Sequence, residues 1–148
     1  MYRYKEASFE ELERRWDINI SNNPGDNRWF VWKYQYIEYN KTGACKTFVV
    51  LDENEPIGEG TLLFLPEYCE VNALRINKKY EGKGHISKLV KLMEQYAANI
   101  GYKSLAIGVE AKEVRNIAIY LHWGYNNFIK HEIEDNVLIL YYSKSLNN

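Results

Sequence analysis

The residues most suggestive of chemistry are two glycines within the lysine-rich segment Lys78 to Lys91. Gly82 and Gly84 stand just before an amphipathic stretch that begins at His85. Five lysines and one acid, Glu81, occur in this segment, although the formal net charge of the 148-residue chain is −1. Glycine allows a ligand to approach the backbone closely, and a helix N-terminus presents unpaired N–H groups. The segment is therefore a candidate phosphate-binding site.

The same segment also fits an ordinary turn followed by a solvated helix. Glycines often precede helices, and lysines often line exposed helix faces. Two common nucleotide-binding patterns, Gly-x-x-x-x-Gly-Lys-Ser/Thr and Gly-x-Gly-x-x-Gly, do not match here. The loop taken alone leaves both interpretations open.

The elements around this loop resemble the acetyl-CoA loop of the GNAT superfamily of acyltransferases. The family signature is Arg/Gln-x-x-Gly-x-Gly/Ala, and Gly84 matches its central glycine. Glu81 stands at the Arg/Gln position and Ile86 at the final small position. The resemblance implies that backbone amides hold the CoA pyrophosphate, with Lys83 or Lys88 near an outer phosphate. The cofactor-binding residues it implies in the loop are Glu81, Gly82, Lys83, Gly84, His85, Ile86 and Ser87.

A strand, a long helix and a second strand are predicted around the loop. Apolar residues recur at spacings of three and four from His85 to Ile100, which predicts a helix that ends at Gly101. Cys69 to Ile76 and Ser104 to Val109 read as strands, and this order predicts that they run parallel. In the resembled fold these strands splay, and the pantetheine arm bonds to the first one, here at Leu74 and Ile76.

The chain predicts one α/β domain over residues 1–148, and the resemblance implies a mixed sheet of six or seven strands with helices on both faces. Met1 to Ala7 predicts an edge strand, and a Ser8/Glu11 capping box starts a helix that ends near Asn22. A second helix is expected from Arg28 to Tyr39. The other predicted strands form two hairpins, Lys46 to Leu51 with Pro56 to Leu65 and Asn127 to His131 with Val137 to Ser143. Gly58 and Gly60 indicate a bulge or a close approach by another backbone.

A short helix from Glu113, closed by Gly124, resembles the last helix of the same family, Asn-x-x-Ala-x-x-x-Tyr-x-x-x-Gly-Phe. Tyr120 falls on the family tyrosine, which implies that it donates a proton to the departing CoA sulfur. The alternative is a core aromatic residue whose hydroxyl is already hydrogen-bonded. Glu113 stands at the family asparagine and Asn116 at the family alanine, and Asn116 is a further expected cofactor contact.

Glu70 is the best candidate for the general base that the amine acceptor requires. It precedes Ile76 by an even number of residues, so a regular strand would place Glu70, Leu74 and Ile76 on one face. Some members of the resembled family use a glutamate at this offset through water. A solvated carboxylate at the strand start is an equally good interpretation, and His85 and His122 are weaker alternatives.

The acceptor pocket is expected in the aromatic segment Trp29 to Tyr36, because so many rings on one helix cannot all face inward. Phe30 and Ile37 are assigned to the core, and Trp29, Trp32 and Tyr36 to the pocket. Aromatic rings with Asp26 and Glu38 nearby suit an amine or a cation with an apolar body.

Composition favours a cytoplasmic, single-domain protein without nucleic-acid or membrane partners. Charged residues make up 26% of the chain, the pI is about 6.3, and no apolar run could span a bilayer. Cys45 and Cys69 lack metal-ligand spacing, so we expect reduced structural thiols and no metal. The family often forms dimers, and a homodimer is allowed here.

The sequence therefore favours an N-acetyltransferase that moves the acetyl group of acetyl-CoA directly to a primary amine of a small molecule. The alternatives are a non-catalytic acyl-CoA binding or sensing module and an acetyltransferase that acts on a protein amine. A structural dimer-forming protein without a ligand is a third class.

Overall fold

The computed structural model describes residues 1–146 and contains the mixture of strands and helices expected from the sequence. The chain forms two compact units, one of residues Met1–Leu63 with Ala73–Met93, the other of Phe64–Asn72 with the chain from Glu94 onward. The seven strands follow the hydrogen-bonded order β1-β2-β3-β4-β5-β7-β6. The predicted mixed α/β sheet is thus confirmed, and strand β4 (Cys69–Ile76) contributes residues to both units.

The first unit is built on an antiparallel meander. Strand β1 (Tyr2–Glu6) pairs with β2 (Cys45–Asp52), which pairs with β3 (Glu55–Phe64) in the predicted hairpin, with a turn at Glu53 and Asn54. The backbone N–H of Asn77 donates to the Ile57 carbonyl at 2.8 Å, so the end of β4 lies beside β3. As expected, β1 is an edge strand of the sheet.

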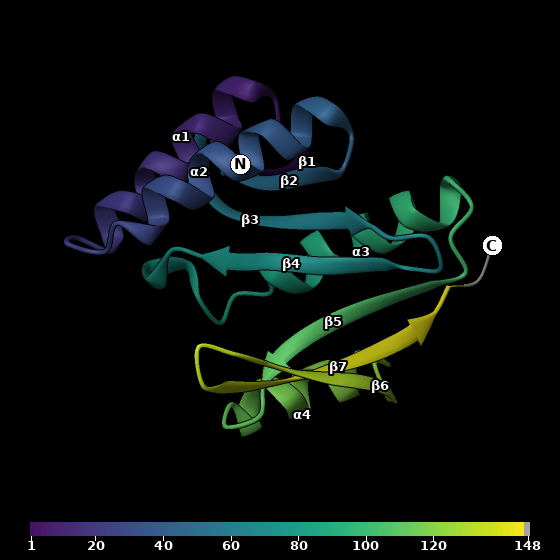
Figure 1. Ribbon diagram of the computed structural model, residues 1–148. Helices are drawn as coiled ribbons and strands as arrows, with labels where there is room; N and C mark the ends of the chain where they lie inside the picture. Colours follow the sequence, from purple (N-terminus) through teal and green to yellow (C-terminus); the bar gives the residue numbers. More distant parts are fainter. Residues whose placement is uncertain (147–148) are drawn as a thin grey trace. The chain divides into compact units, whose positions relative to one another are not determined.

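Two helices lie side by side in this unit (Figure 1), α1 (Phe9–Asn22) and α2 (Arg28–Thr42). The capping box predicted at Ser8 is present, with reciprocal hydrogen bonds to Glu11. Helix α2 contains no fully buried residue among those described. The assignment of Phe30 to the core is wrong, because this ring is 50% exposed.

Helix α3 (His85–Asn99) begins in the first unit and lies across β3 from α1. Within β3 the Glu59 side chain is bonded by Arg15 of α1, whereas a Cβ at the next residue, Gly60, would meet Met93 of α3 at 2.8 Å. Successive strand residues face opposite ways, so helices cover both faces of β3. A Cβ at Gly58 would lie 2.9 Å from the Arg75 carbonyl oxygen, which confirms the predicted close backbone approach.

The second unit contains the parallel strand pair and the last hairpin. The first residues of β4 run parallel to β5 (Ser104–Glu110), with Cys69 opposite Leu105 and Val71 opposite Ile107. Strand β5 pairs antiparallel with β7 (Val137–Ser145), and β7 pairs with β6 (Asn127–Glu134). Helix α4 (Val114–His122) follows β5. The predicted parallel pair and final hairpin are therefore confirmed.

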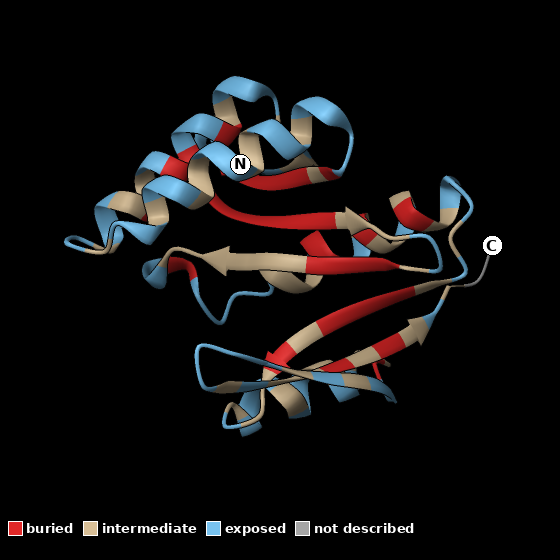
Figure 2. Cartoon of the chain, viewed as in Figure 1, coloured by how far each residue is buried: buried red, intermediate tan, exposed pale blue. Residues whose placement is uncertain are grey.

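Buried apolar residues are concentrated on the central strands and on one side of helices α1 and α3. Figure 2 shows β2 and β3 almost wholly buried, and α1 buried only where Leu12, Arg15, Trp16 and Asn19 lie. Cys45 and Cys69 are buried free thiols, as expected. No helix within residues 1–146 has the length and apolar character needed to cross a lipid bilayer.

Candidate functional site

The loop between β4 and α3 has the backbone geometry of an anion site. After a single 3-10 turn at Lys78–Tyr80, Gly82 and Gly84 adopt left-handed φ angles of 74° and 85°. Nothing lies within 4 Å of a Cβ built at either glycine, so the space over the loop is open. The Lys88 N–H donates to the Gly84 carbonyl at 3.2 Å, which leaves the amides of the preceding helix residues without an intrahelical acceptor.

Two buried side chains hold the ends of this loop to the first unit. The Tyr80 hydroxyl donates to Asp52 Oδ2 at 2.6 Å, and this bond raises the pKa of Tyr80 to about 12. The Tyr4 hydroxyl lies 2.7 Å from His85 Nδ1, and burial lowers the pKa of His85 below its usual value. The anchored ends and exposed middle give the loop a defined shape before any ligand binds.

The electrostatic setting of the loop fits a diphosphate. Its five lysines, Lys78, Lys79, Lys83, Lys88 and Lys91, are all exposed, and within residues 1–146 none of them takes part in an ion pair. Glu81 is exposed as well, and Ile86 is half-buried in the first helical turn. Exposed glycines, open amides and lysines are the groups that bind a phosphate or diphosphate.

Tyr120 lies near the C-terminal end of α4 in the second unit. Its ring is half-buried and lies 5.6 Å from the Trp123 ring between centroids. Burial raises the pKa of the Tyr120 hydroxyl, and the nearby Glu113 charge adds to the effect. Within residues 1–146 no hydrogen-bond partner is present for this hydroxyl. The group is protonated at neutral pH and has a proton to donate. Asn116 is on the same helix and is exposed.

Glu70 is buried on β4, with 8% of its surface exposed, so the interpretation as a solvated carboxylate is wrong. Burial is the main cause that raises its pKa, and the Lys130 ammonium, 3.7 Å away, acts in the opposite direction.

Ala73, which has a φ of 54°, interrupts the regular alternation of side chains along β4 beyond Asn72. The even-spacing argument that joined Glu70 to Leu74 and Ile76 is therefore wrong. Leu74 and Ile76 themselves lie half-buried on β4.

The aromatic residues assigned to the acceptor pocket form a cluster with Trp16 of α1. Trp16 stacks on Tyr36 at 5.3 Å between centroids and lies 6.3 Å from Trp29, which meets Trp32 edge-on at 5.1 Å. The structure thus brings the three predicted pocket residues together. The cation over these rings is the protein's own, because the Arg75 guanidinium lies 5.1 Å from the Trp16 centroid and 4.8 Å from that of Trp29.

Sequence reasoning missed the polar network beneath this cluster. Glu59 accepts from Arg15 Nε at 2.8 Å, from Asn19 Nδ2 at 2.7 Å and from Arg75 Nη1 at 3.1 Å. Arg15 Nη1 also donates to Asn77 Oδ1 at 2.6 Å, at the residue that opens the loop. The available signal was that Arg15 and Asn19 fall on the apolar stripe of α1 with Leu12 and Trp16.

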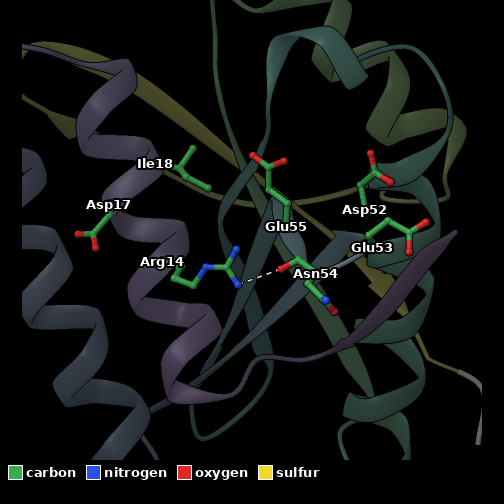
Figure 3. Close-up of a pocket in the computed structure, with 7 residues that line it drawn as sticks. All are labelled: Arg14, Asp17, Ile18, Asp52, Glu53, Asn54 and Glu55. Atoms are coloured by element: carbon green, nitrogen blue, oxygen red, sulfur yellow. Dashed lines mark hydrogen bonds between the residues drawn. The ribbon is translucent and has the colours of Figure 1, made fainter.

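A surface hollow of about 720 Å³ lies on another part of the first unit (Figure 3). Arg14 reaches from α1 toward the β2–β3 turn and donates to the Asn54 carbonyl at 2.9 Å. Four acids, Asp17, Asp52, Glu53 and Glu55, line the hollow together with Ile18. None of the predicted site residues lines it.

Comparison with known proteins shows the family. The model of the Acetyltransferase (GNAT) family matches residues 6–125, so the chain belongs to this family, whose members use acetyl-CoA. No curated protein sequence matches the chain significantly.

Solved structures of low sequence identity share the fold. The ribosomal-protein-S18-alanine N-acetyltransferase from Escherichia coli is 12% identical with a TM-score of 0.79, covering 100% of this chain and 96% of that one. A variant of the spermidine N-acetyltransferase SpeG from Vibrio cholerae is 15% identical with a TM-score of 0.77, covering 98% and 94%. PaiA N-acetyltransferase from Thermoplasma acidophilum, solved with coenzyme A, is 14% identical with a TM-score of 0.68, covering 98% and 99%.

Proposed function

We propose that this protein is an N-acetyltransferase that moves the acetyl group of acetyl-CoA directly to a primary amine of a small molecule. The observation that carries the proposal is the open loop at the start of α3, where Gly82 and Gly84 expose backbone amides beside lysines that form no ion pair within the described residues. Membership of the GNAT family supports the cofactor. A cytoplasmic location and a homodimer stay predictions.

The residues of the loop would bind the pyrophosphate mainly through backbone N–H groups. The residues assigned to this role are Gly82, Lys83, Gly84, His85, Ile86 and Ser87, with Glu81 at the loop edge and with Leu74, Ile76 and Asn116 as further cofactor contacts. Bound acetyl-CoA supplies an acetyl group activated as a thioester. Because amides provide most of the donors, the exposed Glu81 weakens the site without removing it.

Tyr120 and Glu70 are the proposed acid and base. Attack by the amine nitrogen forms the new C–N bond and breaks the C–S bond, so the sulfur needs a proton and the amine must lose one. Tyr120 would give its phenolic proton to the sulfur, since its raised pKa keeps it protonated. Glu70 would accept the amine proton directly or through water, and its raised pKa makes it a stronger base than an exposed glutamate.

Calorimetry with CoA and acetyl-CoA, followed by thiol release across a panel of amines, tests the proposal. Gly84→Ala should weaken CoA binding by about tenfold or more, because the new methyl group enters the open space and a left-handed φ is unfavourable for alanine. Gly43→Ala is the matched control, with a φ of 83° and equally open surroundings. It should leave CoA affinity unchanged.

The outcomes separate the candidate functions. Saturable CoA binding with thiol release only when an amine is present supports the enzyme. Saturable binding without release for any amine would favour a non-catalytic acyl-CoA sensing module, and release only with peptide N-termini would favour a protein acceptor. No heat with either nucleotide would remove the proposal.

A further inference from the structure

The environment of Arg75 indicates what the acceptor carries besides its amine. Two guanidinium groups, those of Arg15 and Arg75, share the single carboxylate of Glu59. The side chains of Arg15 and Glu59 are each only 2% exposed, whereas that of Arg75 is 26% exposed. The network therefore holds one positive charge in excess, and that charge has access to solvent only through Arg75.

Within this network, Arg75 is the partly exposed cation, and its N–H groups are not all used in hydrogen bonds. Arg15 is bonded to Glu59, to the Pro56 carbonyl and to Asn77, all within the first unit. Both oxygens of Glu59 are already used, one by Arg15 and the other by Asn19 and Arg75. The side chain of Arg75 makes a single hydrogen bond within residues 1–146, through Nη1. Its other N–H groups are left to bind a ligand.

Trp16 and Trp29 restrict the position of this guanidinium. Its central carbon lies 5.1 Å and 4.8 Å from the two ring centroids, so the fork is held in place before a ligand arrives. A second cation is disfavoured here, since like charges repel and the two ring faces already interact with Arg75. The preferred ligand is an oxyanion that accepts two parallel N–H bonds, which is the geometry of a carboxylate.

We propose that Arg75 binds a carboxylate of the acceptor, so that the acceptor is a primary amine that also carries a carboxylate group. The inference rests on the proposed acetyl transfer and names the substrate class of that reaction. The Arg75–Glu59–Arg15–Asn77 chain of hydrogen bonds ends at the residue that opens the candidate pyrophosphate loop. The proposed carboxylate site therefore lies in the same unit as that loop and is tied to it by side-chain bonds.

The experiment compares amino acids with the amines that remain after decarboxylation. Suitable pairs are lysine and cadaverine, tryptophan and tryptamine, and phenylalanine and phenethylamine, with phosphoethanolamine as an arm that carries a different oxyanion. The amino acid of at least one pair should have the higher kcat/KM by about tenfold to a hundredfold, the usual value of a charge-assisted hydrogen bond.

Variants of Arg75 should change this preference through KM. In Arg75→Met the ratio within the preferred pair should fall to about one, with kcat for the decarboxylated amine retained. Glu59 keeps Arg15 and Asn19 as partners in this variant, so the fold is expected to persist. Arg75→Lys, which keeps the charge but loses the fork, should recover part of the preference. Arg14→Met, an arginine on the same helix as Arg15, is the matched control.

Two readouts keep this inference distinct from the proposed function. Calorimetry with acetyl-CoA should give the same affinity in Arg75→Met as in the parent protein. Tryptophan emission should respond to the amino acids without acetyl-CoA and lose that response in Arg75→Met, because Trp16 and Trp29 contact Arg75. A preference for the decarboxylated amines or for phosphoethanolamine, or an equal loss for both members of each pair in Arg75→Met, would overturn the carboxylate assignment. Failure of CoA binding with an intact fluorescence response would instead remove only acetyl transfer.

Discussion

Glu59 and Glu70 are both buried carboxylates on strands, but their partners differ. Glu59 in the first unit has two arginines and an amide bonded within 3.1 Å. Glu70 in the second unit has one lysine at 3.7 Å, and its pKa is raised mainly by burial. Two buried carboxylates with different partners thus have different chemistry. Both oxygens of Glu59 accept hydrogen bonds, and this carboxylate holds two guanidinium groups in place. Glu70 has few donors around it, so it can still accept a proton as a general base.

The largest expected effect on stability comes from removing the Glu59 carboxylate. Glu59→Ala leaves the guanidinium of Arg15 buried without its anion, so the free energy of unfolding should fall by about 3–5 kcal/mol. Urea unfolding measures it, with Glu53→Ala as the control, because the Glu53 ion pair to the N-terminus is exposed. A loss similar to that of the control would show that the network contributes nothing to stability.

Tyr120→Phe tests whether the second unit contains the acid that complements Glu70. The variant removes only the hydroxyl, so kcat should fall about a hundredfold or more while the dissociation constant for CoA stays the same. Steady-state kinetics and calorimetry give the two numbers. If turnover is unchanged, Tyr120 has no role as the proton donor.

Glu70→Gln should lower kcat by about a hundredfold, since the proposed base is lost. In the parent protein activity should fall as pH drops through the raised pKa of Glu70, and the variant should lack this fall at low pH, the acid limb of the profile.

The stability of Glu70→Gln offers an independent check on the raised pKa of Glu70. A carboxyl whose folded pKa is raised favours folding below its unfolded pKa, and this contribution is lost as pH rises through the folded pKa. Glu70→Gln should therefore raise the melting temperature at pH 7 and change it little at pH 4.

The smallest expected effect is a shift of that acid limb in Lys130→Met. The Lys130 charge lowers the pKa of Glu70, so its removal should move the limb to higher pH. The pH profile of kcat measures the shift, and Lys112→Met, an exposed lysine after β5, is the control. A shift to lower pH would contradict the assignment of the limb to Glu70.

Much of the fold was predictable because its signals are local. Apolar spacing marks α3, Ser8 and Glu11 start α1, and a polar turn joins β2 to β3. The interruption at Ala73 was not predictable, since an alanine carries no sign of a positive φ and surrounding contacts must hold it there. The exposure of Phe30 was also missed, because α2 packs too few of its rings to bury them all.

The candidate loop was predictable from local sequence, whereas the contacts of the aromatic cluster were not. Glycine is the residue type that adopts positive φ angles most readily, so Gly82 and Gly84 located the loop in the sequence. Trp29, Trp32 and Tyr36 form one cluster with Trp16 in the structure, but the aromatic segment did not indicate which cation meets them. Arg75 lies far along the chain from Trp29, and no local pattern joins the two.

The sequence by itself determined the order of the elements, the position of the glycine loop and the family resemblance, because propensities, caps and motif spacing act over a few neighbouring residues. Only the tertiary structure decided that Glu70 is buried, that Glu59 neutralises Arg15, and that Arg75 lies over Trp16 and Trp29. Burial and the pairing of charges are properties of segments distant in the chain, and folding alone brings those segments within hydrogen-bonding distance.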